Sequence, residues 1–278
     1  MKKRILLVNE FSGLNTGYAV YGRNLFNELY KTGKYELAEL AVYLDSRDPR
    51  RGQFPWKIYP GVPGPENQQL HQQYHGDPNN AFGRLMFENT ALDFKPDCLI
   101  CFRDTWMERF IPESPFRPYF RWGWLATIDG LPQQADWLNM YGETDALFTY
   151  SDWSKSVIED YGLKVEATAS PVAEPCFQPV QDKEAFKKQF GFDGIKIIGM
   201  GSRNQARKLF PDLMEAFREV LNQTGRSDVY LYLHTSNQDQ GWNLPEIIKQ
   251  NGLSSKVILT YVCKKCGYAF PSMYSDEN

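Results

Sequence analysis

The sequence lacks a long hydrophobic run. Its first apolar run, Ile5–Val8, stops at Asn9 and Glu10 and is too short for the hydrophobic part of a signal peptide. No other segment approaches the roughly 20 apolar residues that cross a bilayer. These absences predict a chain without a membrane span, and we expect a cytoplasmic protein.

Charge and cysteine usage argue against two further classes of protein. The formal net charge is −3 and there is no basic run, whereas proteins that hold nucleic acid electrostatically present a basic face. We therefore expect no nucleic-acid partner. The five cysteines, an odd number, do not suggest a disulfide framework.

The length and the apolar pattern indicate an α/β protein. A chain of 278 residues suggests roughly two domains. Short apolar runs alternate with segments of helical spacing, as in parallel-sheet folds. Strands are predicted at 4–9, 36–44, 98–102, 121–128, 145–150, 165–169, 197–201, 229–235 and 256–262, and helices at 17–29, 82–93, 151–162, 185–190 and 242–250.

The segment after residue 197 has the properties of a phosphate site. An apolar run ends in Gly201 and Ser202, and a glycine there lets a ligand approach the backbone. Arg203 and Lys208 add positive charge where a helix is expected to open, and free N–H groups at a helix start favour anions. The alternative is a basic surface turn between a core strand and an amphipathic helix.

Three segments together resemble the retaining GT-B glycosyltransferases of family 4, also called glycosyl transferases group 1. The first is the Arg203-x4-Lys208 spacing, which is followed by the apolar helix segment Leu213–Phe217. The second is 151–162, in which Ser151 is a suitable helix N-cap and Gly162 a suitable stop. The third is the proline-rich stretch 170–179. Leu209 departs from the family, which has glycine after the lysine.

The resemblance implies a fold and a reaction. The fold is GT-B, with two Rossmann-like doubly wound domains facing a cleft. The expected parts are an acceptor domain at 1–169, a linker at 170–184 and the start of a donor domain at 185–278. The implied reaction transfers a sugar from a UDP- or GDP-sugar, with retention of configuration and without a required metal, to a glycan, lipid, protein or small-molecule acceptor.

The resemblance also assigns site residues. Gly201, Ser202, Arg203 and Lys208 would bind the donor diphosphate. In the first domain, Asn15, Thr16 and Gly17 would lie in the loop between acceptor and donor, although Thr16 and the glycines also suit a tight turn with a helix cap. Asp129 follows a predicted strand and would contact the transferred sugar, or would simply cap a turn.

The long segment 45–80 is rich in Pro, Gly, Gln and Arg and is predicted to be a loop. Such a loop inside a domain is usually functional or disordered. In GT-B enzymes the loops of the first domain bind the acceptor, so this segment is a candidate for acceptor contacts. A mobile surface excursion is the alternative.

Two cysteine pairs share the C-x-x-C spacing. Cys98 and Cys101 fall in a predicted strand, where residues three apart point to opposite faces, and they are interpreted as apolar residues. Cys263 and Cys266, followed by Gly267, have the spacing of half a zinc ribbon. Structural zinc is therefore possible, but a second ligand pair does not follow before residue 278.

Two alternatives to a complete transferase stay open. After 195 there is room for only three strands and a tail, whereas a doubly wound half needs roughly five or six. The donor domain is therefore expected to be truncated, and a catalytically incomplete binding or interaction module is one alternative. The other is an NAD-type Rossmann enzyme that uses Gly199, Gly201 and Asn204 as its fingerprint, although Asn204 replaces the third glycine.

Overall fold

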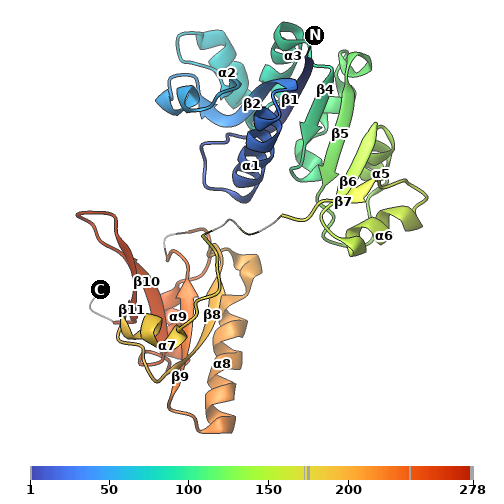
Figure 1. The fold of residues 1–278 in the computed structure, drawn as a ribbon. Coiled ribbons are helices and arrows are strands. Elements are labelled where there is room, and N and C mark those ends of the chain that lie inside the picture. The colour runs from blue at the N-terminus through green and yellow to red at the C-terminus, as the bar shows by residue number, and fades with distance from the viewer. Residues whose placement is uncertain (1, 172, 174–175, 238, 276–278) are drawn as a thin grey trace. The chain divides into compact units, whose positions relative to one another are not determined.

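The computed structural model describes residues 2–171, 173, 176–237 and 239–275. The chain divides into two units, 1–174 and 175–278, which Figure 1 colours from blue to yellow and from yellow to red. The division falls inside the segment 170–184, and the limits predicted for that linker stay a prediction.

The first unit is built on a seven-stranded parallel sheet with the strand order β3-β2-β1-β4-β5-β6-β7. The strands are β1 Lys3–Glu10, β2 Tyr35–Asp45, β3 Lys57–Val62, β4 Cys98–Cys101, β5 Arg121–Ala126, β6 Ala146–Thr149 and β7 Ala167–Thr168. The helices are α1 Gly17–Lys31, α2 Gln68–Gly76, α3 Arg84–Phe94, α4 Phe110–Glu113, α5 Ala135–Gly142 and α6 Asp152–Asp160. Strand order reverses on either side of β1, as in doubly wound folds.

Both faces of this sheet are covered, because alternate residues of each strand point to opposite sides. Leu6 and Val8 of β1 join a core that includes residues of α3, α4, α5 and α6. Ile5 and Leu7 join a second core that contains Phe26 of α1. The predicted doubly wound α/β architecture is confirmed for this unit.

The two cysteines of β4 follow the same alternation. Cys101 is buried in the first core and its sulfur accepts a hydrogen bond from the Trp122 indole at 3.2 Å. Cys98 packs against the opposite core. The prediction that they are apolar strand residues on opposite faces is confirmed.

Residues 45–80 correct the prediction of a long loop. They contain β3, α2 and the 3-10 turn Pro49–Gln53, and a second 3-10 turn, Pro78–Phe82, begins at their end. The edge strand β3 begins directly after Trp56, which is buried and donates its indole N–H to Glu39 at 2.9 Å. Pro60 lies within β3 and obscured the strand in the sequence, but an edge strand tolerates proline because one side of its ladder is unpaired.

The second unit is a four-stranded sheet with the order β11-β10-β9-β8. Its elements are α7 Lys183–Lys188, β8 Lys196–Gly201, α8 Phe210–Thr224, β9 Val229–His234, α9 Leu244–Gln250, β10 Val257–Val262 and β11 Ala269–Met273. Strands β8, β9 and β10 are parallel, while β11 is antiparallel to β10. The expectation of three strands and a tail was wrong by one strand, since a hairpin returns the chain alongside β10.

The core of the second unit lies on one face of its sheet. Phe210, Met214 and Phe217 of α8 pack against Leu231 and Leu233 of β9, and residues of α9 complete the cluster. The spacing of the α8 residues, at i, i+4 and i+7, gives one apolar helix face. This packing fixes α8 against one face of the sheet, with Phe210 at its start following the carboxyl end of β8.

Helix caps predicted from sequence are present in the first unit. The Ser151 hydroxyl accepts a hydrogen bond from the backbone N–H of Ser154 at 3.1 Å, and Gly162 after the end of α6 has a φ of +81°. Thr16 caps α1 by accepting from the N–H of Ala19 at 3.3 Å. These contacts satisfy helix N–H groups that have no partner within the helix.

Candidate functional site

The segment after β8 lies at the carboxyl edge of the second sheet. Gly201 ends β8 opposite His234, which ends β9. The loops that follow, 202–209 and 235–243, therefore leave the sheet side by side. Open α/β sheets bind ligands at this edge.

Arg203 is held by a carboxylate from the neighbouring loop. Its Nε and Nη2 each donate to a different oxygen of Asp239 at 2.9 Å. The arginine side chain is 70% exposed and the aspartate 15% exposed. Hydrogen bonds from Arg203 hold the pKa of the Asp239 carboxyl below its usual range. The arginine that was predicted to bind phosphate therefore lies at the edge of the sheet, where its guanidinium is paired with the carboxylate of Asp239.

Asn204 links the same two loops through hydrogen bonds made from a buried position. It is fully buried, its Oδ1 accepts from the backbone N–H of Trp242 at 2.9 Å and its Nδ2 donates to the Trp242 carbonyl at 2.7 Å. Gly241 permits this approach, since a Cβ there would lie 2.3 Å from the Asn204 Oδ1. This clamp was not predicted from the sequence, although the downstream pair Gly241-Trp242 is a signal for it.

The turn between Arg203 and α8 differs from the expected direct helix start. A 3-10 turn, Ala206–Lys208, comes first and places Lys208 half-buried. Leu209 then adopts a left-handed φ of +51° before α8 begins at Phe210. A glycine takes this conformation without steric cost, which gives a physical reason for the glycine that the resembling family has at this place.

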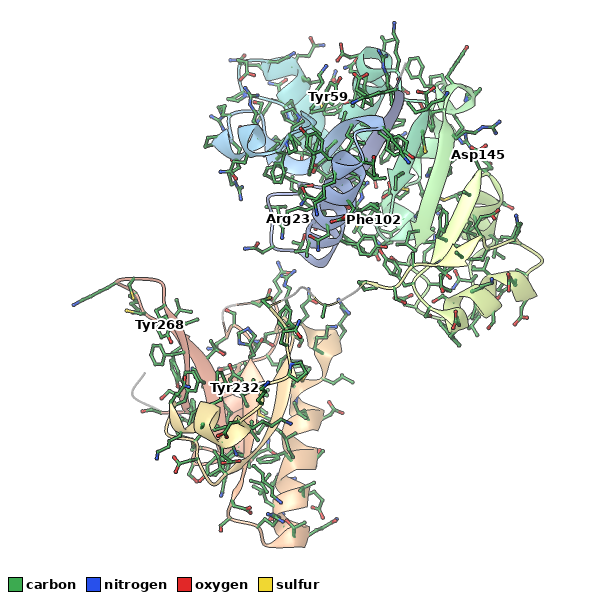
Figure 2. The ribbon with its side chains drawn as sticks, in the orientation of Figure 1. Arg23, Tyr59, Phe102, Asp145, Tyr232 and Tyr268 are labelled. Carbon is green, nitrogen blue, oxygen red and sulfur yellow. The ribbon has the colours of Figure 1, made fainter. Side chains whose placement is uncertain are left out.

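His234 also lies at this edge, at the end of β9. Its Nδ1 lies 2.7 Å from the Thr260 hydroxyl and 3.4 Å from the Tyr232 hydroxyl; Figure 2 labels Tyr232. The imidazole is therefore engaged by a hydroxyl of the neighbouring strand β10.

The first unit has a polar cluster at its own carboxyl edge that was not predicted from the sequence. The Tyr18 hydroxyl donates to Asp104 at 2.7 Å and lies 3.3 Å from the Thr127 hydroxyl. Asp104 and Thr127 follow β4 and β5, while Tyr18 belongs to the first turn of α1. Burial, above all other causes, raises the pKa of Tyr18, so this phenol stays protonated and donates. The signal available in the sequence was an acid directly after β4, matching Asp129 after β5.

A buried ion pair supports Asp104. The neighbouring Arg103 donates from Nε and Nη2 to the two oxygens of Glu108, at 2.8 and 2.9 Å, and neither side chain is exposed to solvent. This pair fixes the short segment that carries Asp104 between β4 and α4. The half-buried Asp104 is therefore positioned by rigid neighbours and not by a free loop.

The predicted loop residues Asn15, Thr16 and Gly17 line a groove of about 510 Å³ in the first unit, together with residues such as Tyr21 and Ser170. Thr16 donates its hydroxyl to Glu10 as well as capping α1. The loop is held from beneath by Arg23, which donates to the Ser12 carbonyl at 2.8 Å. Arg23 lies on α1 in Figure 2. The loop therefore lines a groove beside the edge of the sheet as well as forming the turn that caps α1.

Asp129 lies in the exposed segment after β5. Gln133 holds this segment by donating to the Gly130 carbonyl at 2.6 Å, and its Oε1 accepts from the Tyr141 hydroxyl at 3.4 Å. Burial raises the pKa of Tyr141 to about 12, a hydrogen bond with Thr105 opposes the shift, and the Asp129 charge adds to it. Asp129 therefore stands at the carboxyl edge beside the polar cluster, and its role stays a prediction.

Cys263 and Cys266 lie in the loop between β10 and β11, which extends beyond the sheet in Figure 1. Both thiols are free. Across the described ranges, no group of three or more His, Cys, Asp or Glu side chains is arranged to hold a metal ion. Within those ranges there is also no helix long and apolar enough to cross a membrane.

Comparison with known proteins places the fold. No family model and no curated protein sequence matches the chain. Among solved structures, it resembles sucrose-phosphate synthase from Thermosynechococcus elongatus (15% identity, TM-score 0.59, covering 93% of this chain and 70% of that one). It also resembles α,α-trehalose 6-phosphate synthase from Burkholderia multivorans (14% identity, TM-score 0.60, covering 90% of this chain and 69% of that one). A third similar structure is MnaA from S. aureus in complex with UDP (13% identity, TM-score 0.57, covering 92% of this chain and 67% of that one). These similarities confirm the predicted GT-B fold.

Proposed function

We propose that the chain is a glycosyltransferase of the family-4 type, which transfers a sugar from a nucleotide-sugar donor to an acceptor with retention of configuration. The observation that carries the proposal is the loop after β8. It brings Gly201, Ser202, Arg203 and Lys208 to the carboxyl ends of the parallel strands β8 and β9, in a fold shared with a protein whose structure contains UDP.

The donor diphosphate would bind along this loop. Arg203 presents a largely exposed fork that suits a phosphate as well as the Asp239 carboxylate. Lys208 follows one turn later and would add a second charge. As the bond to the sugar breaks, negative charge grows on the departing diphosphate, and the two cations stabilise it electrostatically. This role is available to the side chains without a metal ion.

The first unit would hold the acceptor and the transferred sugar. The groove along Asn15, Thr16 and Gly17 supplies a surface, and Asp104 and Tyr18 supply hydrogen-bonding groups that are already oriented. Asp129, at the same edge, would contact the transferred sugar. The acceptor would be a glycan, a lipid, a protein or a small molecule. We expect the reaction to take place in the cytoplasm.

The fingerprint of an NAD enzyme is less favoured by the geometry. That motif opens a helix directly, and its third glycine allows close packing of helix and strand. Here Asn204 fills the third position with a side chain that binds Trp242, and a 3-10 turn separates it from α8. The loop is therefore better suited to a side-chain phosphate grip.

Release of nucleoside diphosphate tests the proposed activity. The purified chain is incubated with UDP- and GDP-sugars and mixed acceptors, and free UDP or GDP is measured. We expect release with one donor class, reduced in Arg203→Ala and retained in Arg226→Ala, which removes an arginine from a comparable exposed ion pair. Binding of UDP or GDP without release would instead support the non-catalytic binding module.

A further inference from the structure

The loop between β10 and β11 forms a tight turn around the second cysteine pair. The last paired residues are Val262 and Ala269. The Cys263 N–H donates to the Tyr268 carbonyl at 2.8 Å, and the Gly267 N–H donates to the Cys263 carbonyl at 2.9 Å. Gly267 has a φ of +72°, which closes the turn without steric cost. Tyr268 marks this hairpin in Figure 2.

Both cysteines of the pair lie within this one turn, between the last paired residues. Both thiols are free. Lys264 and Lys265 add positive charge within the same turn. The thiolate is the form of cysteine that binds metals.

The other C-x-x-C pair shows that spacing alone does not create such a site. Cys98 and Cys101 lie in a strand and belong to cores on opposite faces of the sheet. By contrast, Cys263 is half-buried and Cys266 exposed at a solvent-facing turn. Only the second pair brings both thiols to one accessible place.

From the hairpin geometry we propose that Cys263 and Cys266 bind a thiophilic divalent metal, zinc, as half of a tetrahedral site. Zinc prefers thiolate sulfur and four ligands. The described residues supply two of them, so the other two come from another copy of the chain, from solvent or from residues outside those described. The bound metal would fix the hairpin tip, and the site is independent of the donor loop.

Cobalt substitution tests the metal site. The reduced chain is titrated with Co²⁺, and the sulfur-to-cobalt charge-transfer band is recorded before and after addition of Zn²⁺. We expect a band in the wild type that zinc displaces. Cys263→Ser and Cys266→Ser should lose it, whereas Cys98→Ser, with the same chemistry at the other pair, should keep it.

The outcomes of two measurements show where the other two metal ligands come from and whether the proposal fails. Native mass spectrometry that finds one metal per chain indicates that solvent or the same chain completes the site. One metal per two chains indicates a shared four-sulfur site. Absence of a thiolate band in the wild type, or a band that survives in Cys266→Ser, overturns the proposal. Circular dichroism of each variant checks that it is folded.

Discussion

Arg203 and Asp239 join the two loops at the edge of the second sheet through two hydrogen bonds of 2.9 Å. This paired fork is also the arrangement with which arginine binds phosphate. Asp239 therefore occupies the guanidinium that the proposed donor would use. A diphosphate must displace the carboxylate or share the arginine with it.

Removing the Asp239 charge should strengthen nucleotide binding. In Asp239→Asn the arginine is no longer neutralised, and a negative charge near the phosphates is lost. We expect UDP or GDP to bind about two- to fivefold more tightly, the scale of an exposed ion pair. Calorimetry measures the affinity. Asp228→Asn, which breaks the comparable Arg226 pair, should leave it unchanged, and equal affinity for wild type and Asp239→Asn would refute the competition.

Replacing Leu209 with glycine should stabilise the second unit. Leu209 has a φ of +51° and is 54% exposed, so little packing is lost when its side chain is removed. A left-handed conformation costs a residue with a side chain about 1–2 kcal/mol. Glycine avoids this steric cost, but it loses more conformational entropy on folding, which offsets part of the gain. Urea unfolding should show Leu209→Gly more stable than Leu209→Ala by about 1 kcal/mol. A less stable glycine variant would contradict the strain.

The polar cluster of the first unit should affect transfer and not donor binding. Asp104→Asn removes the charge that orients Tyr18 while keeping the shape of the side chain. We expect slower nucleotide release in the presence of acceptor and an unchanged affinity for UDP or GDP. Asp93→Asn is the matched control, because Asp93 accepts from the hydroxyl of Tyr59, labelled in Figure 2, away from the carboxyl edge. Equal rates in both variants would argue against a role for Asp104.

Asp145 should contribute to the pH dependence of stability. Burial tends to raise its pKa, but hydrogen bonds from Arg121, the Trp122 N–H and Arg117 outweigh this and leave the pKa below its usual range. A lowered folded-state pKa stabilises the protein above the unfolded value of about 4, and this stability is lost as the pH falls. Figure 2 labels Asp145.

The substitution Asp145→Asn should therefore destabilise the protein at neutral pH and flatten its loss of stability in acid. Thermal unfolding between neutral and acidic pH measures both effects. Asp136→Asn, at a more exposed carboxylate that lies 3.4 Å from Arg109, should change the profile less. Parallel profiles for wild type and Asp145→Asn would contradict the assignment.

Much of the fold was predictable because strands buried on both faces appear as continuous apolar runs. The runs at 4–9 and 121–128 correspond to β1 and β5, and the cap at Ser151 follows from local chemistry alone. The edge strand β3 was missed because Pro60 interrupts its pattern. Strand β11 was missed because, among the described residues, it pairs with β10 alone, across the cysteine turn, and such a pairing leaves no local pattern.

The site was predictable in place but not in its contacts. Arg203 could be assigned to the end of a strand from the local sequence. Its pairing with Asp239 depends on a second loop that Asn204 draws close, and such contacts between distant segments leave no local pattern. The Tyr18–Asp104 pair was missed for the same reason, since it forms only when α1 and the end of β4 meet.

Calorimetric titration of UDP, GDP and NAD into the wild-type chain and Arg203→Ala tests the donor site without knowledge of the acceptor. We expect UDP or GDP to bind and Arg203→Ala to weaken binding by about tenfold, the scale of a charge-assisted contact. Arg226→Ala should bind as the wild type does. Binding of NAD alone, or binding of no nucleotide by a folded wild-type chain, would contradict the proposed glycosyltransferase.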